Sequence, residues 1–516
     1  MRALAAAAMA GLIASGVAAQ QATTAPMSAI GWLSQSVETP SQPATPTEPP
    51  VSGSASTPPV TSQPLGQATV DGVGILPPSV TGLPATLWAA SDAATLTDLI
   101  GAERVETLPA LQDLIVTLML AEADPPAGAG KGSPLFLARV DKLLDLGALE
   151  PAQSLIEAAK PDTPALFRRW FDIALLTRTE DTACKLLQSQ PDILPTYAAR
   201  VFCIARGGQW DVAALILNTG RALGDIPPEE EELLTRFLDP AYADGAPPLP
   251  PPSHVTPLIF RLREAIGEPL ATGDLPRAFA NADLADTTGW KGQIEAAERL
   301  ARNGALSENV LQALYTARTP AASGGVWDRA QAVQTLDAAV TAGDAGAVAA
   351  ALPAAWAAMQ SVRCEVPFAK LYAEQVRAMP LTGQAAALAF RIALLSPSYE
   401  AAAQAYQPTT DEERFLAALA RGSVTPTDVP AGWTEAARAR AVAAAFSGAA
   451  PSPALAGLVT QGKLGEALLQ AVATFNAGLA GDPVQVTDAL ALLRQVGLEN
   501  VARKAALQYL LLDRAP

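Results

Sequence analysis

Residues 147–152 of the chain read Gly147-Ala148-Leu149-Glu150-Pro151-Ala152. The order is a glycine, a large apolar residue two positions later, and an alanine five positions after the glycine. Glycine readily takes the left-handed conformation that ends a helix, and the alanine lets the next helix approach closely. The large residue packs the turn against a core, so the pattern predicts a turn between antiparallel helices. It recurs at Gly208–Ala213, Gly273–Ala278 and Gly462–Ala467, and more loosely from Gly304, Gly343 and Gly497.

Between these turns, apolar residues recur every three or four positions from about Leu87 onward, which predicts one helix after another. Aligning Ala152, Ala183 and Ala213 gives spacings of 31 and 30 residues, and Gly462 and Gly497 are 35 residues apart. A period of 30–35 residues made of helix pairs predicts an all-α fold, an α-solenoid of antiparallel helix pairs. The helices predicted in the first half are Thr107–Glu122, Pro134–Leu146, Pro151–Lys160, Pro164–Thr177, Glu180–Ser189, Pro195–Arg206, Gln209–Leu223 and Glu229–Leu238.

Two acidic runs are interpreted as helix starts. Glu229–Glu232 follows Pro228, and Asp411–Glu413 follows Thr409 and Thr410, which can cap a helix. Negative charge is favourable at a helix N-terminus, which accounts for both runs without a binding role. Carboxylates from distant segments can still meet in the fold, so a paired-carboxylate enzyme remains an alternative.

The helix pairs resemble degenerate tetratricopeptide-like (TPR-like) repeats of proteins of the bacterial periplasm. The resemblance rests on the small alanine after a glycine-containing turn, as in Gly147–Ala152, Gly208–Ala213 and Gly462–Ala467, and covers about residues 85–516. The family's register of about 34 residues and its Trp-Leu-Gly-Tyr positions are not kept. The resemblance implies a stacked helical array that binds protein partners, and it assigns no individual binding residue.

The first 19 residues are interpreted as a secretory signal peptide. Arg2 supplies a positive start, Leu4–Val17 an apolar stretch, and Val17-Ala18-Ala19 the small residues of a cleavage site. No other long, strongly apolar run follows, so we expect no integral membrane segment after signal cleavage. The expected location is the periplasm, after secretion across the inner membrane.

Residues 20–84 differ in composition from the rest of the chain. Eight prolines fall in the 25 residues from Pro40 to Pro64, mixed with Ser, Thr, Gln and Gly, which predicts a disordered Pro/Ser/Thr-rich segment. Within it, residues 27–38 form a short amphipathic island. The island is a candidate docking helix on a flexible tether. It could instead fold back on its own body or be a chance apolar scatter. Its candidate partner-binding residues are Ile30, Trp32, Leu33 and Val37.

A proline-rich break divides the helical part. Residues 241–257 contain Pro247-Pro248-Leu249-Pro250-Pro251-Pro252, which predicts a rigid linker or a strap over the surface. We therefore expect an N-terminal helical-repeat part at 85–240 and a C-terminal one at 258–516. The two parts could also form one continuous arc.

The three cysteines fit an exported protein. Cys184 and Cys203 lie 19 residues apart in separate predicted helices that could pack side by side, so they are candidates for a disulfide. The alternative is that both are small core residues. Cys364 would remain alone, and no metal-ligand spacing occurs among the cysteines.

Composition excludes several classes of function. The chain of 516 residues has 35 basic and 51 acidic residues, a net charge of −16, which argues against nucleic acid and anionic membranes. A single histidine, His254, makes a histidine metal site or a histidine general base improbable. We expect no cofactor, no metal and no catalytic residue. The eight tryptophans are expected to be mostly core or turn anchors, with one or two lining a groove as binding hot spots.

These observations predict an exported, non-enzymatic scaffold or adaptor that binds protein partners in a cell-envelope complex. The flagellar motor is one such machine, by architectural analogy alone. One alternative is an envelope enzyme acting on peptidoglycan or polysaccharide. The other is a solenoid that binds a peptide or a small molecule. The oligomeric state is left open.

Overall fold

The computed structural model describes residues 69–512, apart from 131, 191–192, 194–195, 244 and 480. The predicted signal peptide, the island at 27–38 and the rest of residues 20–68 lie outside the described residues. The prediction of disorder is wrong for residues 69–84, because Leu76 and Leu83 are buried there and the segment contains the short helix α2 (Pro78–Thr81). Throughout the described part the chain is helical, with no β-strand and two isolated bridges, Leu76 with Ala121 and Asp92 with Ala127. The predicted all-α class is therefore confirmed.

The helices of the first half begin and end close to their predicted residues. Helices α5 and α8 have the predicted bounds, and the others differ by a few residues at their ends. The helices α2–α7 are Pro78–Thr81, Ala93–Ala102, Pro109–Leu120, Pro134–Leu146, Leu149–Ala159 and Pro164–Leu176. They are followed by α8 Glu180–Ser189, α9 Tyr197–Arg206, α10 Trp210–Leu223, α11 Pro228–Leu238, the 3-10 helix η3 Pro240–Ala243 and α12 Pro257–Ala265.

The second half continues the array of short helices. In chain order they are η4 Arg277–Leu284, α13 Trp290–Ala301, α14 Glu308–Thr316, α15 Val326–Ala342, α16 Ala345–Ser361, α17 Glu365–Arg377, α18 Gly383–Ala393, α19 Tyr399–Ala405, α20 Asp411–Ala420, η5 Pro426–Asp428, α21 Ala436–Phe446, α22 Pro453–Thr460, α23 Leu464–Leu479, α24 Pro483–Gln495 and α25 Glu499–Leu511.

The repeated turns have the predicted conformation at three of the four full copies. Gly147, Gly208 and Gly462 have φ angles of 78°, 80° and 75°, and the alanine that follows each of them is fully buried. The prediction is wrong for Gly273–Ala278. There Gly273 lacks a positive φ, and a short 3-10 helix follows instead of an α-helix. Pro276 explains the difference, because the residue before a proline avoids the helical conformation, so no helix begins at Leu275 as α6 begins at Leu149.

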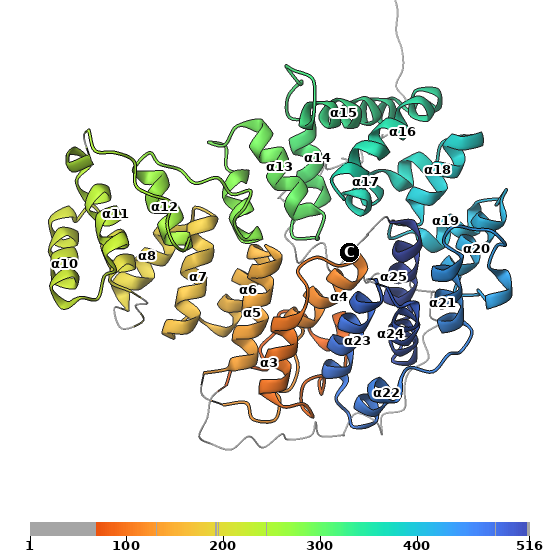
Figure 1. Ribbon diagram of the computed structural model, residues 1–516, viewed down its shortest axis with the longest axis horizontal. Helices are drawn as coiled ribbons and strands as arrows, with labels where there is room; N and C mark the ends of the chain where they lie inside the picture. The colour runs from red at the N-terminus through yellow and green to blue at the C-terminus, as the bar shows by residue number, and fades with distance from the viewer. Residues whose placement is uncertain are drawn as a thin grey trace, which may run out of the picture.

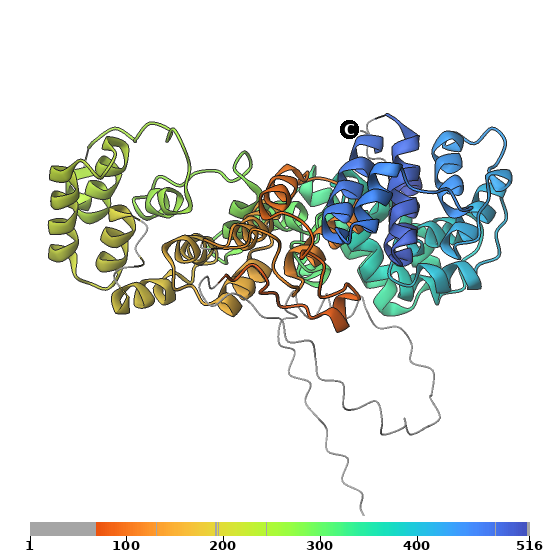
Figure 2. The same cartoon turned by 90° about the horizontal axis from the view of Figure 1, so that it is seen from below.

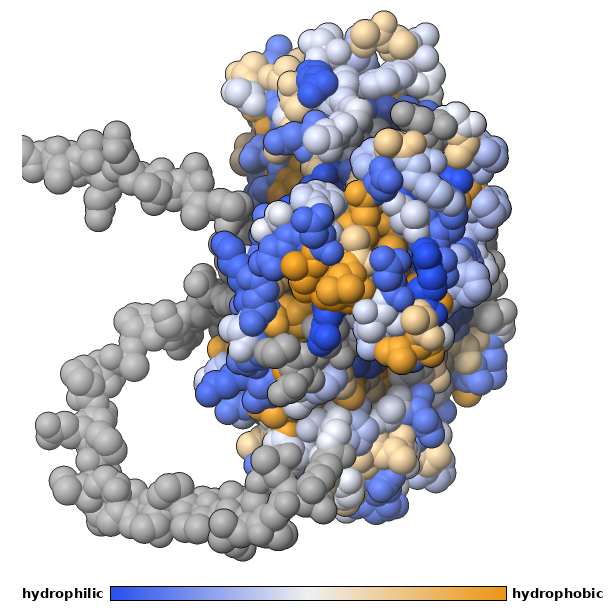
Figure 3. Space-filling model, turned by 90° about the vertical axis from the view of Figure 1, so that its left-hand side faces the viewer, coloured by the Kyte–Doolittle hydropathy of each residue, from blue (hydrophilic) through white to orange (hydrophobic). Residues whose placement is uncertain are grey.

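Helices α8–α12 form an arm that extends from one side of the molecule (Figures 1 and 2). The chain runs outward through α8 and α9, turns at α10 and returns through α11 to α12, which packs on α7 and α11. Neighbouring aromatic rings 5.8–6.3 Å apart run from α7 into the arm, and they belong to Trp170, Phe167, Phe171, Phe202, Phe237 and Trp210. Viewed from its tip, the arm presents an apolar patch bordered by hydrophilic residues (Figure 3).

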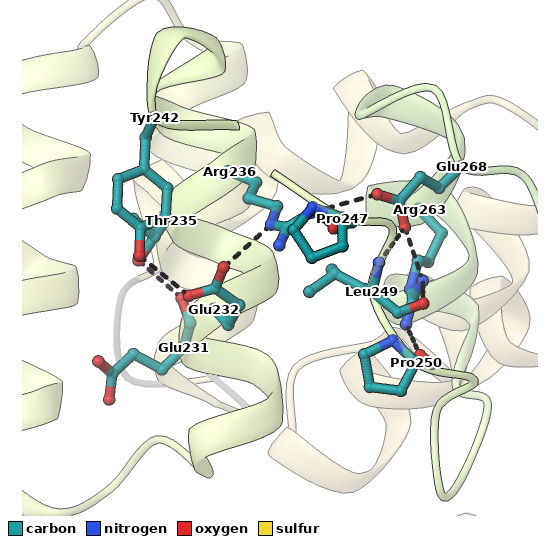
Figure 4. Close-up of polar contacts among 10 residues, drawn as sticks. All are labelled: Glu231, Glu232, Thr235, Arg236, Tyr242, Pro247, Leu249, Pro250, Arg263 and Glu268. Atoms are coloured by element: carbon teal, nitrogen blue, oxygen red, sulfur yellow. Dashed lines mark hydrogen bonds and ion pairs between the residues drawn. The ribbon is translucent and has the colours of Figure 1, made fainter. Parts of the chain in front are cut away.

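The proline-rich residues 245–256 lie across α11 and α12 as a strap (Figure 4). The Arg236 guanidinium donates to the Pro247 carbonyl over 3.0 Å, and the Arg263 guanidinium donates to the Leu249 carbonyl over 3.2 Å. Glu268 accepts the Leu249 N–H over 3.0 Å and forms ion pairs with both arginines. Because proline has no N–H, carbonyls are the main groups through which this segment can be held.

Helices α13–α25 curve round until they meet the N-terminal helices (Figure 1), and we call α3, α4 and α13–α25 the ring. Helix α23 packs on α3 and α4, and α25 packs on α4. The Gly465 N–H donates to the Leu87 carbonyl over 3.0 Å, and the Gln508 side chain accepts the Ala110 N–H over 2.8 Å. One apolar core extends from Leu76 to Leu512 through these contacts, so both ends of the array are joined.

Candidate protein-binding cleft

A cleft of about 230 Å³ opens inside the ring between helices that are far apart in the sequence. Helices α16, α18, α20 and α25 and the turn before α21 supply its walls. Five leucines, two tryptophans and four polar or charged residues line it, so its surface is mixed. The lining residues are Trp356, Gln360, Leu388, Arg391, Leu395, Glu412, Leu416, Trp433, Glu435, Leu510 and Leu511.

The two tryptophans are each held by a buried phenylalanine. The Trp356 ring lies 5.8 Å from that of Phe368, and the Trp433 ring lies 5.6 Å from that of Phe415 in an edge-on arrangement. Both phenylalanines are fully buried, while both tryptophans are half-buried. The indole rings are therefore fixed on one side and open on the other, which is the arrangement of aromatic anchors in protein interfaces.

The charged residues of the cleft all have partners of opposite charge. Arg391 lies 3.7 Å from Glu412, and Arg438, next to the cleft, lies 3.0 Å from Glu435. Arg391 is 49% exposed and Glu412 is 39% exposed, so solvent screens this pair and it adds little to stability. The pairs leave the rim close to neutral, and either charge can turn toward a bound polar group.

Helix α25 completes the cleft. Leu510 and Leu511 are the last two residues of α25, whose position is set by contacts with α4, α20, α21 and α24. The cleft therefore depends on the packing of the C-terminal helix against the N-terminal helices. A second cleft, of about 160 Å³, lies on another face of α18 and is lined mainly by alanines and by Phe390 and Tyr406.

The sequence predicted one or two tryptophans in a groove without identifying them. Trp88, Trp170 and Trp290 are buried, as expected of core anchors. Trp210 departs from that expectation, because 48% of its surface is exposed at the start of α10. The turn signal at Gly208 could not reveal this, since α10 lies at the tip of the arm, where no further helix covers it.

The structure joins Cys184 on α8 to Cys203 on α9 in a disulfide, with Cα atoms 5.0 Å apart. The bridge ties two helices of the arm together, away from the cleft. Cys364 is buried. The candidate residues Ile30, Trp32, Leu33 and Val37 lie outside the described residues, so their docking stays a prediction.

The described residues also bear on metal binding and on membrane-spanning helices. His254 is exposed on the strap. Within residues 69–512, less the short gaps, there is no cluster of three or more His, Cys, Asp or Glu side chains suited to a metal ion. No described helix combines the length and the apolar character needed to cross a bilayer.

Comparisons with known proteins found no matching family model, no similar curated protein and no similar solved structure.

Proposed function

We propose that this chain is an exported, non-enzymatic adaptor that binds protein partners in a cell-envelope complex, and that the two-tryptophan cleft holds a segment of a partner. The observation that carries the proposal is the pair of half-buried indole rings, each in contact with a buried phenylalanine, that line one cleft. Rigid aromatic anchors in a recess are the usual energetic centre of a protein interface.

The size of the cleft favours a protein segment over a small molecule. Sites for drug-sized molecules usually measure roughly 300–1,000 Å³. The cleft measures about 230 Å³, which suits one or two side chains of a peptide. The remaining affinity would come from the surrounding surface of the ring. A neutral rim also suits a protein segment better than it suits nucleic acid or a strongly charged ligand.

Export is part of the proposal. Its support is the signal-peptide pattern of residues 1–19 together with the Cys184–Cys203 disulfide, because disulfides persist in oxidising compartments such as the periplasm. TPR-like periplasmic scaffolds are the class of protein that the helix pairs resemble. The flagellar motor remains one candidate machine, by architectural analogy alone.

Partner binding is tested by reversing one charge at the cleft. Crosslinking in cells, affinity purification and mass spectrometry would compare the full-length chain with its Arg391→Glu variant. We expect a defined set of envelope proteins with the parent chain and at least a tenfold loss of recovery with the variant, because two carboxylates would then face each other. Arg414→Glu is the matched control, since Arg414 is 59% exposed on α20, outside the cleft.

The same experiment shows whether partners bind the cleft or the island at residues 27–38. A chain lacking residues 27–38 should keep its cleft-bound partners. Loss of partners on that deletion, with Arg391→Glu behaving like the parent, would assign binding to the island and contradict the cleft proposal. A monomer with no partner in any form would contradict the adaptor itself.

A second candidate, an enzyme acting on peptidoglycan or polysaccharide, is favoured by one observation. Glu412 and Glu435 both line the cleft, and paired carboxylates are the machinery of glycoside hydrolysis. Each is engaged by an arginine, which suits a structural role better than proton donation. Release of soluble muropeptides by the purified chain, abolished by Glu412→Gln, would establish the enzyme over the adaptor.

A further inference from the structure

Three arginines from separate elements converge on the carboxylate of Glu106, which lies in the connection between α3 and α4. Arg277, at the start of η4, lies 2.9 Å from this carboxylate, and Arg302, directly after α13, lies 3.0 Å from it. Arg363, in the turn between α16 and α17, lies 3.3 Å from it. We call these three residues the arginine cluster. The cluster thus joins a loop of the first half of the chain to three segments of the second half.

Positive charge is in excess in the arginine cluster, although the chain has a net charge of −16. Among the residues that the structure describes, Glu106 is the only carboxylate that forms an ion pair with Arg277 or Arg302. Burial and, second, the charge of Arg302 lower the pKa of Arg277 from 12.5 to about 10, although Glu106 opposes the shift. One carboxylate therefore does not balance the guanidiniums, and a further anion beside them would be stabilised.

The arginine cluster also has N–H groups that are available to a ligand. A guanidinium carries about five N–H donors. Within the described part of the chain, Arg302 donates from Nη2 alone, to Glu106 over 3.0 Å, and its buried Nε has no acceptor. Arg302 and Arg363 are 28% and 48% exposed, so an anion in solution can reach both. Guanidinium groups bind carboxylate and phosphate oxygens well, so these two side chains offer donors and charge suited to an oxyanion.

We propose that the arginine cluster binds a compact oxyanion, either a phosphate or a carboxylate group, and that Glu106 takes its place when no such anion is present. Glu106 is itself an example of the ligand, because Arg277 and Arg302 share its Oε1 and Arg363 contacts its Oε2. The Glu106 side chain is 47% exposed, so it can turn into solvent and leave the cluster to another anion. Arg277 donates to the Val105 carbonyl over 3.1 Å, which keeps its charge in place below the site.

A bound oxyanion would take over the contacts that the Glu106 carboxylate makes. Arg302 and Arg363 would hold it in hydrogen-bonded ion pairs, with the charge of Arg277 behind them. Only the folded chain brings these three guanidiniums together, so the anion would stabilise the folded state. The inference does not rest on the proposed function, because none of these residues lines the two-tryptophan cleft.

The test removes the internal carboxylate and supplies an external anion. Glu106→Gln should lower the melting temperature of the full-length chain by about 2 °C or more in chloride buffer, because like charges are left together. Inorganic phosphate at the same ionic strength should restore the melting temperature, since phosphate would bind where the carboxylate lay. The double variant Glu106→Gln/Arg302→Gln should not be restored, because the cluster then lacks one of its two accessible guanidiniums.

Glu374→Gln is the matched control. Glu374 is exposed and forms an ion pair of 2.7 Å with Arg377 within α17. Its response to phosphate should equal that of the parent chain, and it measures the general stabilising effect of phosphate on folded proteins. Restoration of Glu374→Gln or of the double variant to the same extent as Glu106→Gln would overturn the proposal.

Calorimetric titration identifies the group that binds. The parent chain and Glu106→Gln are titrated with inorganic phosphate and, separately, with a tetraglutamate peptide. The preferred anion should bind Glu106→Gln at least tenfold more tightly than the parent, since the internal competitor is gone. Arg363→Gln should weaken binding to the parent at least fivefold, which keeps the test valid even if Glu106→Gln does not fold. Tighter binding of phosphate assigns a phosphate group, tighter binding of the peptide assigns carboxylates of a protein segment, and no binding of either anion overturns the proposal.

Discussion

Glu103 shows how the packing of the fold acts on a single residue. It lies at the end of α3 and is 5% exposed, and one of its carboxyl oxygens has no hydrogen-bond partner among the described residues. Lys142, from α5, donates over 2.9 Å to the Glu103 carbonyl oxygen rather than to its carboxyl group. Burial raises the pKa of Glu103 from 4.5 to about 8, with Lys142 partly opposing the shift. Folding therefore keeps this carboxyl group protonated at neutral pH.

This raised pKa predicts a pH dependence of stability. Between pH 4.5 and about 8 the unfolded state has lost the proton that the folded state retains, so stability falls as pH rises through this window. The slope approaches about 1.4 kcal/mol per pH unit. Glu103→Gln, which mimics the protonated group, should remove this slope, as measured by denaturant unfolding at several pH values. Exposed Glu150→Gln is the control. Parallel profiles for the parent and Glu103→Gln would contradict the assignment.

The helices were largely predictable from the sequence, because their signals are local. Thr410 caps α20 and forms a capping box with Glu413, so the acidic run Asp411–Glu413 is a helix start, as predicted. Glu229–Glu232 likewise lies in the first turns of α11. The predicted repeat turn at Gly273 is wrong, because Pro276 prevents it. The exposure of Trp210 was not predicted, because it depends on the position of α10 in the arm.

A close contact between elements gives a second prediction. A Cβ atom on Gly465, in α23, would lie 2.4 Å from the Trp88 ring and 2.8 Å from the Leu87 carbonyl oxygen. Trp88 is fully buried and has no room to move. Gly465→Ala should therefore destabilise the protein by about 1–3 kcal/mol, although alanine favours a helix.

Thermal unfolding followed by circular dichroism measures this effect. Gly457→Ala in α22 is the control, because the nearest atom to its Cβ would be the end of a flexible glutamine side chain 3.9 Å away. That variant should be neutral or more stable. Equal melting temperatures for the two variants would show that α23 does not pack tightly against residues 87–88.

At the scale of the whole molecule, the decisive feature is the closure of the ring. In an open solenoid each repeat contacts only its neighbours. Here Gln508 bonds to Ala110, 398 residues away, and α25 carries Leu510 and Leu511 into the cleft. Helical periodicity describes one element at a time and holds no information about such distant pairs. The sequence could therefore predict tryptophans in a groove, but not that Trp356 and Trp433 would share one.

The central claim is that the cleft contacts a protein partner, and site-specific photocrosslinking in cells tests it most directly. A benzoylphenylalanine at Gln360, an exposed residue of the cleft, should yield a discrete adduct with one partner. The same probe at Gln331, exposed on α15 and outside the cleft, should not give that adduct. The adduct from position 360 should weaken at least tenfold when Arg391→Glu is added. The absence of any adduct at 360, or an identical adduct at both positions, would contradict the account.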